Sequence, residues 1–144
     1  MNILTAKELR EKIALAEAAK AAAALKAHEA AEHEKHEMIE RLCKPSGMND
    51  DEIIERASAI VSRAVENGLS QVQVLRFPHT ICKDNGRAIN QAEEGWEQTL
   101  DGVPKEIYEF WKRQLQPRGY HIRYEVVDYP NGMPGDIGIF LSWG

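Results

Sequence analysis

The first 44 residues contain neither glycine nor proline, and the whole chain has two cysteines and no long apolar run. Without a stretch of about 18 apolar residues, no membrane-spanning helix is expected. The start of the chain also lacks the charged, apolar and small-residue sections of a secretion signal, so we expect a cytoplasmic protein with no membrane partner. Cys43 and Cys82 form neither a disulfide framework nor a CxxC pair, and we expect free thiols.

Basic residues are outnumbered, and the net charge is -5. Residues 1–44 carry eight basic and eight acidic side chains, whereas residues 45–144 carry ten basic and fifteen acidic ones. Binding to phosphates requires a basic surface, and neither part of the chain provides one. We therefore expect no nucleic-acid partner.

The composition changes at Lys44–Gly47, where the first proline and glycine appear. Residues 1–44 are expected to form an extended helical arm rich in Ala, Glu and Lys, capped by Thr5 or Asn2. Residues 45–144 have the mixed composition of a compact domain and are of ordinary domain size.

A narrow stripe of mostly small side chains recurs along the arm at helical spacing, beginning with Leu9, Ile13 and Ala16. Such a stripe suits close packing of one helix on another, and a helix about 60 Å long in water gains little stability by itself. We therefore expect a homo-oligomer formed through the arm. A solvated single helix, or an arm docked on another protein, are the alternatives.

The compact domain has patterns typical of two long helices and three strands. The helices run from Asp50 to Asn67 and from Pro104 to Leu115, and the strands are expected at Ser70–Phe77, Tyr120–Asp128 and Asp136–Trp143. The last two strands are expected to pair as a hairpin, and a helical crossover should make the first strand parallel to a neighbour. The predicted fold is α+β, with the helical arm followed by a two-layer domain in which helices cover a small mixed three-stranded sheet.

Histidines and carboxylates gather near the end of the arm, at His28, His33 and His36. The spacing of the histidines does not match the zincin signature, which requires two His four residues apart. His33 and His36 each lie four residues from a glutamate, so a two-ligand metal site is one hypothesis, and a metal-responsive helical oligomer follows from it. The simpler interpretation is a solvated, charged helix.

A polar segment follows the first predicted strand and holds the residues that we propose as a ligand site: His79, Cys82, Asn85, Arg87 and Asn90. Loops at strand ends commonly carry binding residues. Cys82 with His79 or His121 and an acid such as Asp84 would supply a nucleophile, a base and an orienting group. Arg87 with the two asparagines would instead hold a small anion. A capped turn with solvated polar side chains is the simpler alternative.

These patterns favour a small non-catalytic protein that oligomerises through its N-terminal helix and presents the α+β domain as a binding or regulatory module. No cofactor is expected, and a protein partner is possible besides the second copy. A small-molecule sensor or enzyme that uses Cys82, Arg87 and Asn90 is the second hypothesis, and the metal-responsive oligomer is the third.

Overall fold

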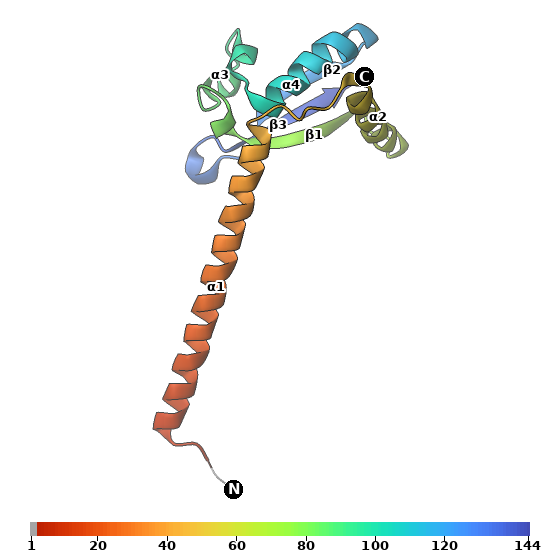
Figure 1. Ribbon diagram of the computed structural model, residues 1–144. Coiled ribbons are helices and arrows are strands. Elements are labelled where there is room, and N and C mark those ends of the chain that lie inside the picture. Colours follow the sequence, from red (N-terminus) through yellow and green to blue (C-terminus); the bar gives the residue numbers. More distant parts are fainter. Residues whose placement is uncertain (1–2) are drawn as a thin grey trace. The chain divides into compact units, whose positions relative to one another are not determined.

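The computed structural model describes residues 3–144 and divides the chain into two compact units (Figure 1). The first unit runs to Met38, and the second spans Ile39–Gly144. The α+β fold class is confirmed, because a long N-terminal helix precedes a three-stranded sheet with accompanying helices. The last turn of that helix belongs to the second unit, so the independence of residues 1–44 and 45–144 stays a prediction.

Helix α1 covers Ala6–Leu42 without interruption. Its start is fixed by a reciprocal cap, in which the Glu8 N–H donates to Thr5 Oγ1 at 3.1 Å and the Thr5 N–H donates to Glu8 Oε2 at 3.2 Å. Thr5 is thus the cap, and Asn2 lies outside the described residues. None of the residues of α1 is buried. No helix within residues 3–144 combines the length and the apolar character needed to cross a membrane.

Helix α2, Asp50–Glu66, has clear signals at both ends. The sequence offers Asn49 or Asp50 as the N-cap, and the structure has Asn49, whose side chain accepts a hydrogen bond from the Glu52 N–H at 2.9 Å. Beyond the helix, Gly68 has a φ of +75°, a conformation that glycine adopts without strain.

The sheet contains β1, Gln71–Pro78, β2, His121–Val126, and β3, Asp136–Ser142, in the order β1-β3-β2 (Figure 1). Both pairings are antiparallel, so the expectation of a mixed sheet was wrong. The predicted hairpin of the last two strands is confirmed. It places β3 against β2, and β1 then pairs with the other edge of β3. The first two strands still run in the same direction, but β3 separates them.

The connection from β1 to β2 is mostly short helical turns. It includes η1, His79–Ile81, α3, Arg87–Asn90, and η2, Trp96–Thr99, before the longer helix α4, Gly102–Phe110. A π-helical turn, η3, Trp111–Leu115, and a 3-10 turn, η4, Gln116–Arg118, continue α4. A further 3-10 turn, η5, Pro130–Gly132, joins β2 to β3.

One face of the sheet forms the hydrophobic core with this connection. Ile137 and Ile139 of β3 and Phe77 of β1 are fully buried, and Leu100 packs on them from the segment before α4. The other face carries polar side chains, among which the Arg123 guanidinium lies 4.5 Å from the centre of the Phe140 ring. The unit therefore has two layers, with helical elements on one side of the sheet.

Candidate functional site

The residues proposed from the sequence as a ligand site, His79, Cys82, Asn85, Arg87 and Asn90, all lie in the connection after β1, but their side chains have separate environments. Cys82 is 3% exposed and belongs to the core, whereas Asn85, Arg87 and Asn90 are exposed. His79 is half-buried. Neighbours in sequence are thus divided between the core and the surface.

Cys82 has the environment of a core side chain. Burial, reinforced by the negative charge of Asp84, raises the pKa of its thiol to about 12, so the thiol is protonated at neutral pH. Nucleophilic attack by cysteine requires the thiolate. The Nδ1 atom of His79 lies 3.0 Å from the carbonyl oxygen of Gly135, and no side-chain hydrogen bond joins it to Cys82 within the described residues. This geometry disfavours a thiol nucleophile.

The amide and guanidinium groups also have partners within the fold. Asn90 Oδ1 accepts a hydrogen bond from the Tyr129 hydroxyl at 3.2 Å, and Arg87 Nη2 lies 3.7 Å from Glu93 Oε2. Asn85 has a φ of +58° and forms part of the turn that precedes α3. These contacts join the connection to itself and to the segment after β2.

Asp84 organises the start of α3. Its carboxylate accepts hydrogen bonds from the N–H groups of Gly86, at 3.0 Å, and Ala88, at 2.9 Å. A side chain that satisfies two free N–H groups at a helix start is a structural cap. The polar segment therefore resembles the capped turn that was the simpler interpretation of the sequence.

The proposed metal ligands lie on α1. His33 Nε2 lies 2.9 Å from Glu37 Oε1, four residues later, and both side chains are largely exposed. Within residues 3–144, no group of three or more His, Cys, Asp or Glu side chains is arranged to hold a metal ion. His28 and His36 lie on the same helix as His33.

A different feature of the second unit has the form of a binding site. A cleft of about 310 Å³ lies between α2 and α4. Its floor consists of side chains from all three strands, Val74 of β1, Ile122 of β2 and Leu141 of β3. Ligand-binding clefts are typically of this size or larger and are lined mainly by apolar side chains.

The two helices supply the walls of the cleft. Ile53, Ala57 and Ile60 line it from α2, one helical turn apart, and Ile107 and Phe110 line it from α4. The half-buried Trp111 continues the α4 wall, and its indole Nε1 donates to the Tyr120 carbonyl at 3.0 Å.

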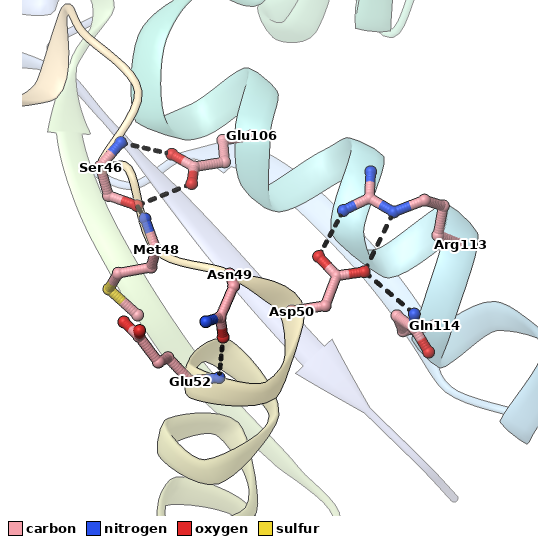
Figure 2. A network of polar contacts seen from close by, with 8 residues as sticks. All are labelled: Ser46, Met48, Asn49, Asp50, Glu52, Glu106, Arg113 and Gln114. Carbon is pink, nitrogen blue, oxygen red and sulfur yellow. Dashed lines mark hydrogen bonds and ion pairs between the residues drawn. The ribbon is translucent and has the colours of Figure 1, made fainter.

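Polar side chains hold α2 and the segment before it against α4 and against the π-helical turn η3 that continues it (Figure 2). The Ser46 N–H and hydroxyl donate to the two carboxylate oxygens of Glu106, at 2.8 Å and 2.6 Å. Farther along, Arg113 donates to both oxygens of Asp50, at 2.7 Å and 3.3 Å, and Gln114 adds a bond of 3.0 Å. These contacts fix the start of α2, where the cleft begins.

The electrostatics of the cleft follow from this pairing. Hydrogen bonds from Arg113 and then from Gln114 lower the pKa of Asp50, so this carboxylate is ionised at neutral pH. Glu106 is bonded to Ser46 at the rim, and Arg56 also lines the cleft. Arg56 makes no ion pair with any residue that the structure describes. The cleft is thus an apolar surface with a few charged groups at its rim.

Sequence reasoning missed the cleft because its lining comes from segments as far apart as Ser46 and Leu141. One signal was present in the sequence. The apolar face of α2 is broad, and a sheet of three strands is too small to cover the apolar faces of several helices. Whether such a face is buried or left open depends on the separation of α2 and α4, which no local pattern encodes.

No model of a known protein family, no curated protein and no solved structure matches this chain.

Proposed function

We propose that this protein is a non-catalytic, self-associating binding protein. Helix α1 is its association element, and the cleft between α2 and α4 makes the second unit a binding module. Both cysteines are free, which suits the reducing conditions of the cytoplasm.

The observation that carries this proposal is the apolar surface that the second unit leaves open. Ala64 is the one buried residue of the 17 in α2, and the cleft beside this helix is lined almost entirely by apolar side chains. Protein helices owe most of their stability to an apolar face packed on another element. Because Ile60 and Val65 of α2 remain 37% and 54% exposed, this helix is suited to receive a further element.

Self-association is supported by the fact that the first unit consists of one helix. It is a single helix, so it has no second element on which Leu9, Ile13 or the alanines can pack. Association with a second copy would cover these side chains. Non-catalytic function is supported by the polar residues after β1, because Asp84 and Asn90 hold the fold and Cys82 is in its core.

The test is the molar mass in solution, measured by light scattering over a range of concentrations. The full chain should give more than one protomer, and a shortened chain spanning Ile39–Gly144 should give one. All residues of the hydrophobic core lie within that shortened chain, and a cooperative melt would verify that it folds. A full chain that stays monomeric at tens of micromolar would contradict the proposal.

A further inference from the structure

Three asparagines of this chain are followed directly by glycine: Asn67, Asn85 and Asn131. Such pairs can deamidate spontaneously, because glycine has no side chain to shield its backbone nitrogen from the asparagine amide group. The nitrogen attacks the asparagine side chain, ammonia leaves, and the asparagine becomes aspartate or isoaspartate. The three pairs are alike in sequence, so their surroundings in the fold must decide which of them reacts.

Two of the pairs have the same backbone conformation. Asn85 and Asn131 have φ angles of +58° and +54°, and the glycines that follow them, Gly86 and Gly132, have φ angles of +82° and +77°. Both pairs are therefore tight left-handed turns of the kind that asparagine and glycine favour. A difference in reactivity between them has to come from the environment of the glycine nitrogen.

The nitrogen of Gly86 is protected. Gly86 is buried, and its N–H donates to the Asp84 carboxylate at 3.0 Å. A carboxylate binds an N–H more strongly than a carbonyl group does, and its negative charge opposes removal of the amide proton. A Cβ added at Gly86 would lie 3.1 Å from Ile137 Cδ1 and 3.2 Å from His79 Cβ. The turn is thus packed against the core, and its backbone has little room to rotate.

The nitrogen of Gly132 has a different environment. Its N–H donates to the Tyr129 carbonyl oxygen at 3.1 Å, within the 3-10 turn η5. Residues 129–133 are all exposed, and a Cβ added at Gly132 would have nothing within 4 Å. Water therefore reaches this peptide group, and the turn can change its conformation without displacing a neighbour.

The third pair is exposed but belongs to the end of helix α2. Asn67 has a φ of -87° and a ψ of 8°, and the Gly68 N–H donates at 2.9 Å to a carbonyl oxygen of the last helical turn. Only residues 67–70 join α2 to β1, whereas the longer segment 127–135 joins β2 to β3. The shorter connection restricts rotation about the Asn67 backbone, so we expect Asn67 to react more slowly than Asn131.

We propose that Asn131 is the site at which the folded protein deamidates, and that Asp84 and the core protect Asn85. The Gly132 nitrogen gives its proton to hydroxide and bonds to Cγ of Asn131, and the side-chain nitrogen takes a proton from water and leaves as ammonia. Water then opens the cyclic imide. Attack at Cγ gives aspartate, and attack at the main-chain carbonyl carbon gives isoaspartate. Water is consumed and ammonia is released, with no change of oxidation state.

Both products alter the connection between β2 and β3. Each adds a negative charge to a segment that already contains Asp128. Isoaspartate also lengthens the main chain by a carbon atom inside η5, where the N–H groups of Gly132 and Met133 donate to Tyr129 and Pro130. This inference does not depend on the proposed self-association, because it concerns the second unit of a single copy.

Peptide mapping by mass spectrometry tests the proposal on the full chain, aged in mildly alkaline buffer. Trypsin cuts after Lys and Arg and places the three asparagines in different peptides. In the folded protein Asn131 should convert roughly tenfold or more faster than Asn85. The control is the same chain in urea, where the three sites should convert at similar rates. Equal rates at Asn85 and Asn131 in the folded protein, or a faster rate at Asn67, would overturn the proposal.

A variant tests the cause of the protection. Asp84→Ala removes the carboxylate that holds the Gly86 N–H, so Asn85 should convert several times faster while the rate at Asn131 stays the same. The matched control is Asp51→Ala, which removes an exposed carboxylate from the first turn of α2 and should leave the rate at Asn85 unchanged. Thermal melts verify that both variants fold. An unchanged rate at Asn85 in Asp84→Ala would contradict the protective role of Asp84.

Discussion

Gly102 is the position at which a single methyl group should have the largest local effect. It is buried at the start of α4 and has a φ of +58°. A Cβ atom added there would meet the backbone at the end of α1, including the carbonyl oxygen of Leu42 and the carbonyl carbon of Cys43, the latter at 2.7 Å. These atoms cannot rotate away as a flexible side chain could. We therefore expect Gly102→Ala to force the two segments apart.

Two costs add up at this position. A non-glycine residue in the left-handed region costs about 1–2 kcal/mol. Forcing an extra carbon into a packed site costs a further ~1–3 kcal/mol. Gly95 provides the matched control, because its φ is +81° and an added Cβ would have nothing within 4 Å. Gly95→Ala should therefore show the backbone cost alone.

Urea unfolding followed by tryptophan fluorescence measures both variants, since Trp96 and Trp111 lie in the second unit. Gly102→Ala should lower the free energy of unfolding by roughly 2–5 kcal/mol, and Gly95→Ala by about 1–2 kcal/mol. If the two substitutions cost the same to within ~0.5 kcal/mol, the close approach of Leu42 and Cys43 to Gly102 is not maintained in solution. The reasoning about this helix junction would then be wrong.

Native protein should expose one reactive thiol per chain to an aromatic disulfide reagent, because Cys43 is exposed while burial raises the pKa of Cys82 to about 12; rapid reaction of both thiols would contradict this. The Arg113 hydrogen bond lowers the pKa of Asp50 below its ordinary value of 3.8, so its contribution to stability is present above that pH and is lost as the pH falls through the lowered pKa. The destabilisation caused by Asp50→Asn at neutral pH should therefore shrink in strong acid, and a gap that stays constant in urea melts would refute the ion pair. Ile139→Ala should cost ~2–5 kcal/mol in the same melts, because this side chain is 0% exposed in the middle of the core.

Local signals in the sequence predicted the elements of this fold well. The absence of glycine and proline before Pro45 gave α1, and Asn49 marked the start of α2, because caps and helix breakers act within a few residues of their own position. The strands were likewise found from alternating side chains, and the hairpin of β2 and β3 from the short connection between them. Each of these signals depends on neighbours in the chain.

The order of the strands and the environment of the polar segment depend on distant residues, and sequence reasoning was weaker there. Nothing local tells whether β1 pairs with β2 or with β3. Cys82 follows Ile81, and both side chains are buried, but the polar residues around them made the segment look like a surface loop. The pair Ile81-Cys82, so soon after the buried Phe77, was the available sign that the chain turns back into the core there.

The central place of β3 has a consequence for synthesis of the protein. Gln71 of β1 pairs with Ser142, and His121 of β2 pairs with the same residue, so neither edge strand has a partner until the last strand in chain order has been made. On the ribosome, α1 can become helical early. Gln71 of β1 cannot pair until Ser142, 71 positions later in the chain, has been added. Pairing over so long a separation slows folding. The sheet of the second unit can therefore form only after β3 has been made, and a nascent chain that ends before Asp136 lacks the strand with which both β1 and β2 pair.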